Sequence, residues 1–209
     1  MFDEPPPPLA GSWDGALLRP LAEINQRMLE SLQLAALAGA AEPRMPRLVM
    51  LLSEHWRRLD TAALQRLAGC PYLLVDAGFG QPERWEQQLM PSVREAPGDS
   101  AYFQGPEGIA LIRRTLVFAW HLARSNRLGA RVLLGMGARS AERIADSRLQ
   151  DLDALAERGP SWILPRWEQQ PTIWRQLIQA ARGAHAGQLR LAQLRGLQLI
   201  AAANTGPQA

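Results

Sequence analysis

Two stretches of the sequence, CPYLLVDAGFGQPERW at residues 70–85 and GPSWILPRWEQQPTIW at residues 159–174, share one spacing of prolines and tryptophan. In each stretch a proline is followed by a short apolar run, by a second proline eleven positions later, and by a tryptophan three positions after that. The second set stands 89 positions after the first. A repeated spacing of this kind indicates one structural unit used twice. We therefore expect two similar units, packed together around a pseudo-twofold axis.

The segments around the first stretch have the three-and-four spacing of apolar residues that is typical of helices. The expected helices of the first unit are residues 17–41, 46–58, 61–68 and 82–90. Pro43 and Pro46 end the first helix, because proline lacks an amide proton and disfavours a helical residue before it. Asp60 or Thr61 caps the third helix. The apolar run at residues 71–75 is too short for a helix and is expected to be extended.

The second unit repeats this order. Its expected helices are residues 108–128, 140–146, 149–158 and 171–182, with a short apolar segment at 130–136 and an extended link at 159–165. Ser140 is a good N-cap for the second of these helices. A last helix, at residues 188–203, has no counterpart in the first unit. Residues 94–108, with two prolines and three glycines, form the expected linker between the units.

The two units also align by residue type away from the prolines. At an offset of 88 the opening helices pair Leu21 with Ile109, Ile24 with Ile112, Met28 with Leu116, Leu29 with Val117, Leu32 with Trp120, and Leu34 with Leu122. We therefore predict an all-α fold of two tandem, similar helical units related by a pseudo-twofold axis, plus a C-terminal helix. The predicted divisions are a disordered proline-rich N-terminus (1–16), a first helical unit (17–95), a linker (96–107), a second helical unit (108–183), and a C-terminal helix and tail (184–209).

Composition places the chain among globular proteins of the cytoplasm. Apolar residues make up 47% of its 209 residues and charged residues 21%. No apolar run approaches the roughly 20 residues that a bilayer crossing needs, so we expect no membrane contact. The acidic, proline-rich N-terminus lacks the pattern of a secretory signal. Cys70, the single cysteine, excludes an internal disulfide framework and a cysteine-rich metal site.

The basic residues are all arginine, and they are unevenly distributed. Residues 1–104 carry nine arginines against thirteen acidic residues, whereas residues 105–209 carry fourteen against seven. A basic half beside an acidic half favours one surface for a polyanion and another for a protein partner. The alternative, that arginine-rich helices are simply well solvated, stays open on charge alone.

No set of residues has the spacing of a catalytic or metal site. The three histidines, His55, His121 and His185, lie on separate segments. The absence of lysine removes Schiff-base chemistry and the usual phosphate-binding loop. Asp76 could act as an acid, but a capped turn before the helix at Pro82 explains it as well. Cys70 reads as a buried structural thiol. We expect no enzyme, no metal and no cofactor.

The tryptophans divide into core and surface candidates. Trp85 and Trp174 occupy equivalent places in the repeat, each near the start of a helix, which favours core packing. Trp167, in PRWEQQP, lies between polar residues and is expected to be exposed. An exposed Arg166–Trp167 pair could stack on a base or anchor a protein partner.

Residues 137–159, GARSAERIADSRLQDLDALAERG, are the nearest approach to a helix-turn-helix motif. Ile144 and Ala145 suit the buried positions of a first helix, and Leu149, Leu152 and Leu155 suit a second. No glycine marks the turn, and an arginine stands where the motif usually has an apolar residue. Helix pairs with this spacing are common in proteins that do not bind DNA, so the pattern is not specific.

Four features of the second half follow one another: LGARVLLG, the two short helices ending in LAERG, the PSWILPRW link, and the following helix with IW. Together they resemble the flagellar master regulators, the FlhD/FlhC-type transcriptional activators. The similarity covers about residues 115–180, and residues 25–90 more faintly. It does not extend to the four-cysteine zinc site of the FlhC-type subunit. The resemblance implies an all-α transcription regulator that works in a homo- or hetero-oligomer with DNA and RNA polymerase.

Two functions of different class follow. A transcription regulator would bind DNA or a regulatory partner through arginines of the basic half, for which the candidates are Arg139, Arg143, Arg148, Arg158 and Arg166, with Trp167 as a partner-binding residue. A helical adaptor or assembly protein would instead bind another protein without nucleic acid. An arginine surface free of acidic residues would favour the regulator, and an exposed apolar groove would favour the adaptor.

Overall fold

The computed structural model describes residues 15–39, 45–88, 102–158, 163–183 and 185–204, and within these ranges the protein is all-α. Two two-residue strands accompany the helices. The elements in chain order are α1 (Gly15–Ala38), α2 (Arg47–Leu51), α3 (Ser53–Arg57), α4 (Thr61–Ala68), β1 (Val75–Asp76), α5 (Pro82–Gln88), α6 (Gly105–Ser125), α7 (Arg127–Leu134), α8 (Ala138–Asp146), α9 (Leu149–Glu157), β2 (Leu164–Pro165), α10 (Pro171–Arg182) and α11 (Ala186–Asn204).

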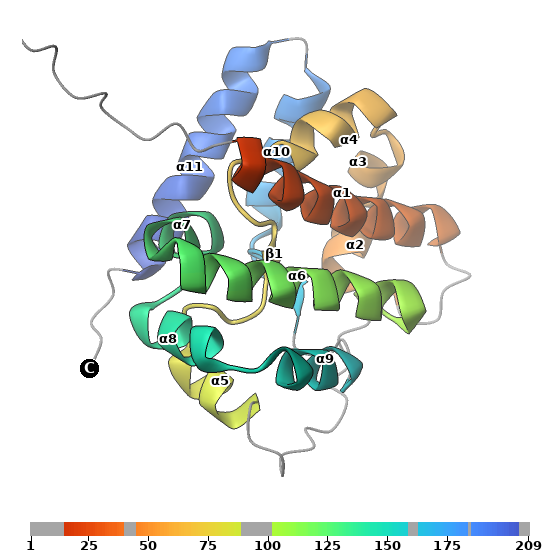
Figure 1. Cartoon of the computed structure of the whole chain (residues 1–209). Helices are drawn as coiled ribbons and strands as arrows, with labels where there is room; N and C mark the ends of the chain where they lie inside the picture. Colours follow the sequence, from red (N-terminus) through yellow and green to blue (C-terminus); the bar gives the residue numbers. More distant parts are fainter. Residues whose placement is uncertain (1–14, 40–44, 89–101, 159–162, 184, 205–209) are drawn as a thin grey trace, which may run out of the picture.

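The two long helices α1 and α6 lie side by side across the middle of the molecule (Figure 1). Helices α3 and α4 pack on α1, and helices α8 and α9 pack on α6. Each long helix turns an apolar stripe inward. Met28, Leu29 and Leu32 of α1 are fully buried, as are Ile112 and Ala119 of α6. This burial of apolar surface is what holds the helices together.

The strands β1 and β2 join the two halves of the chain. They pair antiparallel, with Val75 opposite Pro165 and Asp76 opposite Leu164. The two helices that follow the strands each pack on the opposite half: α5 contacts α8, whereas α10 contacts α3 and α4. The rings of Trp56 in α3 and Trp174 in α10 lie 5.5 Å apart. The halves are therefore interlocked.

Several local features match between the halves. Trp85 and Trp174 are both buried, and the indole N–H of each donates to a backbone carbonyl, of Gly78 at 3.2 Å and of Arg166 at 2.7 Å. The turns before them close with equivalent backbone bonds, Gln81 to Gly78 and Gln170 to Trp167. These parallels agree with an internal duplication but do not superpose the two units, so the duplication stays a prediction.

The alignment of the opening helices at an offset of 88 does not match burial. Leu34 is 69% exposed, whereas its predicted counterpart Leu122 is fully buried. At an offset of 87 the buried positions coincide, as at Leu29 with Leu116. Period alone aligns any two amphipathic helices, so residue type does not fix the register between them, and burial agrees better with an offset of 87.

Some predicted boundaries are wrong for identifiable reasons. The helix expected at residues 46–58 is two short helices, separated at Leu52, whose N–H bonds to the carbonyls of Leu48 and Met50. Residues 130–134 of the apolar segment at 130–136 belong to helix α7, which Asn126 caps through a bond from the Gly129 N–H and which ends with Gly135 as its C-cap. The predicted cap Ser140 is buried inside α8, which follows Gly137 as its N-cap. Asp60 does cap α4.

The predicted linker is only partly described. Residues 96–101 lie outside the described ranges, as do residues 1–14 of the predicted disordered N-terminus. The remainder of the linker is structured: Tyr102 and Phe103 belong to the core, and α6 begins at Gly105. The Tyr102 hydroxyl accepts from the Leu48 N–H and donates to Glu168. Two adjacent aromatic residues within a proline- and glycine-rich segment indicate that this part of the segment is packed into the core.

Helix α11 closes the molecule along one side and packs on α10 and α7 (Figure 1). Its buried residues are Leu189, Gly196 and Ile200. Gly196 lies against the ring of Tyr72, whose hydroxyl oxygen is only 2.1 Å from the place of an added Cβ. A side chain at this position would push the helix off the core. None of the described helices combines the length and the apolar character that crossing a bilayer would require.

Candidate nucleic-acid interface

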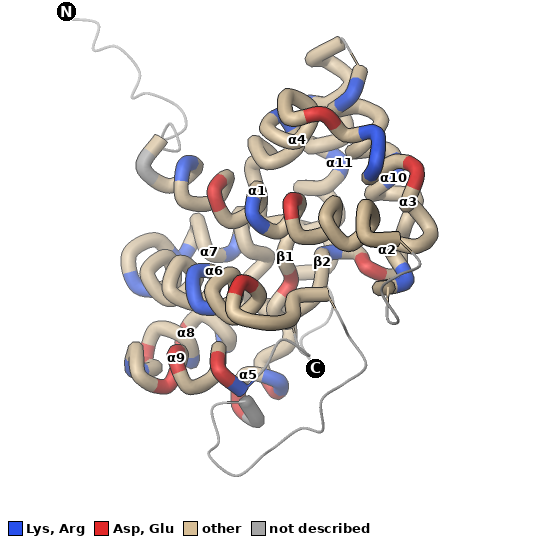
Figure 2. Tube along the Cα trace, turned by 90° about the vertical axis from the view of Figure 1, so that its right-hand side faces the viewer, with Lys and Arg blue, Asp and Glu red and all other residues tan. Residues whose placement is uncertain are grey.

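Four of the five predicted arginines lie at the end of the molecule formed by α8 and α9. Arg139 and Arg143 of α8 are exposed, as are Arg148 and Arg158 on either side of α9. Acidic residues lie among them: Glu142, Asp146, Asp151, Asp153 and Glu157. Figure 2 shows both signs of charge mixed over α5, α8 and α9. Such a surface has little net attraction for a polyanion.

Two of these acidic residues hold α9 to α6. Arg113 of α6 donates to Asp153 at 2.9 Å and to Glu157 at 3.2 Å. A third, Asp151, accepts a bond from the backbone N–H of Arg148 and so caps the start of α9. These carboxylates put negative charge beside the arginines of α8 and α9, so they would oppose phosphate groups at this surface.

The helix pair α8–α9 also departs from the expected helix-turn-helix pattern. Ile144, Leu152 and Leu155 are buried as predicted. Leu149, predicted to be buried, is 44% exposed at the first position of α9. Only Ser147 and Arg148 separate the two helices. The leucine lies outside the core because the buried face of α9 is set by its contact with α6.

The fifth predicted arginine, Arg166, is buried, with 7% of its surface exposed. Its guanidinium donates to the carbonyls of Leu73 at 2.7 Å, Leu134 at 2.7 Å and Val75 at 3.4 Å. Burial lowers the pKa of this guanidinium, and Asp76 opposes that effect. The structure therefore places Arg166 in the core, where it ties β1 to α7, and not on a surface that phosphate could reach.

Trp167 is half-buried and packs against the core, contrary to the expectation of an exposed ring. Its ring meets that of Tyr72 edge to face, with centroids 5.6 Å apart. Its backbone has a φ of 54°, a left-handed conformation that few residues other than glycine adopt. A partner-binding role for Trp167 stays a prediction.

A different basic surface, which was not predicted from the sequence, is formed by α10, α11 and the end of α4. Glu168 is the last acidic residue of the chain, and 41 residues follow it. Exposed arginines within that stretch are Arg175, Arg182, Arg190 and Arg195. None of them forms an ion pair with a described residue. Counting acidic residues after position 168, instead of over the whole second half, would have found this surface.

A pocket of about 580 Å³ opens in this surface where α10 meets α11. Arg66 of α4, Arg182 of α10, and His185 and Arg190 at the start of α11 line it. The Nε–H of Arg66 donates to the carbonyl of Ala181 at 2.7 Å, which fixes its guanidinium beside the last turn of α10. The described lining includes no carboxylate. We call this hollow the α10–α11 pocket.

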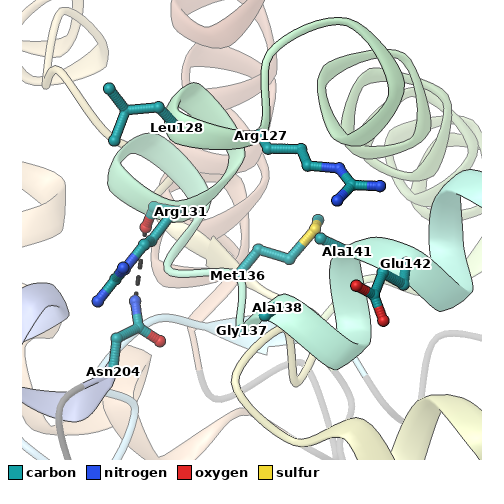
Figure 3. Close-up of a pocket in the computed structure, with 9 residues that line it drawn as sticks. All are labelled: Arg127, Leu128, Arg131, Met136, Gly137, Ala138, Ala141, Glu142 and Asn204. Carbon is teal, nitrogen blue, oxygen red and sulfur yellow. Dashed lines mark hydrogen bonds between the residues drawn. The ribbon is translucent and has the colours of Figure 1, made fainter.

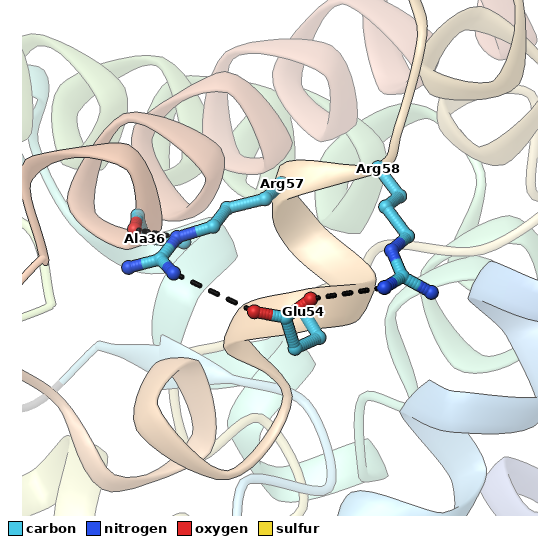
Figure 4. Close-up of polar contacts among 4 residues, drawn as sticks. All are labelled: Ala36, Glu54, Arg57 and Arg58. Carbon is cyan, nitrogen blue, oxygen red and sulfur yellow. Dashed lines mark hydrogen bonds and ion pairs between the residues drawn. The ribbon is translucent and has the colours of Figure 1, made fainter.

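Arg57 and Arg58, at the end of α3, differ from the arginines of the α10–α11 pocket, because they share one carboxylate partner. Glu54 pairs with Arg57 at 3.6 Å and with Arg58 at 3.2 Å, and Arg57 also donates to the carbonyl of Ala36 at 2.9 Å (Figure 4). These contacts join α3 to the end of α1. Glu54 therefore offsets one of the two positive charges here, whereas the described lining of the α10–α11 pocket has no carboxylate.

A second pocket, of about 620 Å³, lies between α7, the start of α8 and the end of α11. Arg127 and Arg131 contribute positive charge, Glu142 negative charge, and Met136 an apolar floor (Figure 3). The side chain of Asn204 reaches the carbonyl of Arg131 at 3.5 Å. This mixed lining distinguishes the pocket from the uniformly basic one at the α10–α11 junction.

The other residues considered for catalysis or metal binding either have structural roles or lie far from one another. The carboxylate of Asp76 accepts from the Gly78 N–H at 2.9 Å, the capped turn considered above. Cys70 is buried, as predicted. Among the described residues no three histidine, cysteine, aspartate or glutamate side chains come together as a metal site would require.

In comparisons with protein-family models, with curated proteins and with solved structures, nothing matched the chain.

Proposed function

We propose that the protein is a DNA-binding transcription regulator of the cytoplasm whose polyanion surface is formed by α10 and α11. The observation that carries the proposal is the set of exposed arginines after Glu168, with no acidic residue among them. Phosphate contacts by lysine and arginine provide essentially all of the non-specific affinity of proteins for DNA, independent of its sequence. The junction of α10 and α11 lies at the top of the molecule in Figure 1, whereas α8 and α9, with their mixed charges, lie toward the bottom, and only the end of α11 approaches α8.

The resemblance to flagellar master regulators supports the same class of function, with RNA polymerase as a further partner. The proposal moves the contact from α8–α9 to α10–α11. Arg195 fits this role because its side chain extends toward α10 and bonds to Gln176 at 3.2 Å, so the two helices present one continuous surface. Arg175 lies on the exposed side of α10.

A titration of DNA binding against salt tests the proposal. Fluorescence anisotropy with mixed genomic duplex fragments at about 50 and about 200 mM salt should show binding that weakens steeply, because counterions are released on binding. Four arginine contacts would give a slope of log affinity against log salt of about −3.6. Absence of binding at the lower salt concentration would remove the regulator from consideration.

Two double variants compare the alternative surfaces. Arg175→Ala with Arg195→Ala should reduce the slope by about 1.8, since two phosphate contacts are lost. Arg139→Ala with Arg143→Ala removes the same charge from α8 and should leave the slope unchanged. If the α8 variant loses more affinity than the α10–α11 variant, the DNA contact lies where the sequence analysis first placed it.

A helical adaptor remains the second candidate, favoured by exposed apolar side chains. Leu34 and Leu37 at the end of α1 and Met50 and Leu51 of α2 are all about half exposed or more. Helices α1 and α2 contact each other, so these side chains belong to neighbouring elements. Sedimentation velocity of wild type and of Leu34→Glu with Met50→Glu tests this surface. Self-association that the variant abolishes would show that this surface binds protein, and it would favour the adaptor if DNA also fails to bind at about 50 mM salt.

A further inference from the structure

The α10–α11 pocket concentrates positive charge from three separate elements. Arg182 follows Arg66 by 116 positions in the sequence, and Arg190 follows Arg182 by 8. The fold brings all three side chains to the lining of one pocket. Like charges repel, so a cluster of three guanidinium groups raises the local positive potential unless an anion neutralises it. The described lining contains no carboxylate to do so.

The groups in the pocket suit an oxyanion. A guanidinium presents several N–H donors in a planar fork, and its bonds to phosphate are stronger than neutral hydrogen bonds. Arg66 uses its Nε–H on Ala181, which leaves its two terminal nitrogens as donors. His185 and Gln193 add polar side chains at the rim, and Leu189 a largely buried apolar wall. A phosphate group matches this donor set better than a planar carboxylate does, because it offers three or four acceptor oxygens.

The first turn of α11 adds to the same potential. Its residues Ala186 and Gly187 carry N–H groups that point away from the helix body, toward its N-terminal end, as the first amides of any helix do. The 19-residue helix places the positive end of its dipole here. Ala186 lines the pocket, and open space surrounds the position of an added Cβ at Gly187. A ligand can therefore approach these amides closely.

We infer that the α10–α11 pocket is a phosphate-binding site, formed by Arg66, Arg182 and Arg190 with the first turn of α11. The phosphate can come from a nucleic-acid backbone or from a free phosphorylated compound. The first source rests on the proposed function, in which this pocket anchors one backbone phosphate within the larger basic surface.

Inorganic phosphate is the probe for the site itself. A titration of the full chain, followed by amide NMR at constant ionic strength with chloride as the balancing anion, should shift the amides of residues 183, 186 and 187 saturably. Arg182→Ala with Arg190→Ala should raise the dissociation constant at least about tenfold, because two charge-assisted donors are lost. Both residues are exposed, and circular dichroism checks that the variant keeps its helix content.

The matched control is Arg114→Ala, which removes an exposed arginine from α6, outside the pocket. Its titration should reproduce that of the wild type. Shifts that fail to saturate, or that are equal in all three proteins, would reflect general screening and would overturn the inference.

A second arm repeats the phosphate titration on the protein bound to duplex DNA. If the amides of the pocket no longer respond, a backbone phosphate occupies the site, and both proposals stand. If free phosphate binds saturably but DNA does not bind at all, the pocket serves a phosphorylated compound and the proposed function fails alone. If DNA binds and free phosphate has no saturable effect, the inference fails and the proposed function stands.

Discussion

Arg166 shows how one residue can be read in opposite ways from sequence and from structure. Beside Trp167 it has the appearance of a surface pair, yet its guanidinium satisfies three backbone carbonyls in the core. Those carbonyls belong to residues 32 and more positions away, so no local pattern could reveal them. A buried cation persists where such partners surround it.

Replacing Arg166 should therefore lower the stability of the protein and remove no contact with DNA. Arg166→Ala leaves buried carbonyls without donors and is expected to lower the free energy of unfolding by about 3 kcal/mol. Arg139→Ala, on the exposed side of α8, should change it by less than about 0.5 kcal/mol. Urea denaturation followed by circular dichroism gives both values. Equal stability in the two variants would contradict the assigned role.

The thiol of Cys70 should be unreactive in the folded protein. Burial raises its pKa from 9.0 to about 12, against hydrogen bonds from Tyr72 and Gln193 that lower it. Only the thiolate attacks thiol reagents, so at pH 8 the folded protein should react slowly, through transient opening of the site. Release of the chromophore from a disulfide reagent, with and without urea, measures this. Rapid reaction without urea would show that the site opens.

The same shift predicts a loss of stability at alkaline pH. The folded-state pKa lies above the unfolded one, so the contribution of Cys70 is complete below about pH 9 and is lost as pH rises toward about 12. Cys70→Ala should unfold with a weaker dependence on pH over that interval. Denaturation at several pH values compares the two proteins, and identical slopes would count against the assignment.

Helix α11 depends on one glycine for its position. Gly196→Ala would place a methyl group against the Tyr72 hydroxyl, a rigid neighbour, and should destabilise the protein by about 1–3 kcal/mol. Because α11 carries Arg190, the change should also disturb the phosphate titration. Gly187→Ala, in the open first turn of the same helix, should leave stability unchanged or slightly higher. Thermal unfolding measures both, and a neutral Gly196→Ala would mean that the helix can shift.

Helix boundaries could be predicted where the sequence has a strong signal. Helix α10 spans the predicted residues 171–182, because Pro171 begins it and Gly183 follows it. The break at Leu52 has no such signal, since leucine is a good helix former, and the two short helices on either side of it both pack on α1. The α10–α11 pocket was equally hidden: Arg66 bonds to a carbonyl 115 positions away. The local sequence pattern predicts helices and strands, but it does not predict the sites that form where distant segments of the chain meet.

At the scale of the whole molecule, the exchange of α5 and α10 between the halves should make unfolding a single event. Neither half keeps its closing helix without the other. We expect circular dichroism, tryptophan fluorescence and Cys70 reactivity to give one coincident urea transition. Two separate transitions would instead show that residues 17–95 and 108–183 behave as independent domains.

The pairing of Trp56 with Trp174 gives the protein an optical marker of its own assembly. Two indoles at 5.5 Å, tilted by 49°, couple their electronic transitions, and coupled chromophores in a chiral arrangement produce a paired positive and negative band in circular dichroism. One ring comes from each half of the chain, so the couplet exists only while the halves are joined. The assembly of the two halves can thus be followed in real time, without any attached dye, by the circular dichroism of the protein's own tryptophans.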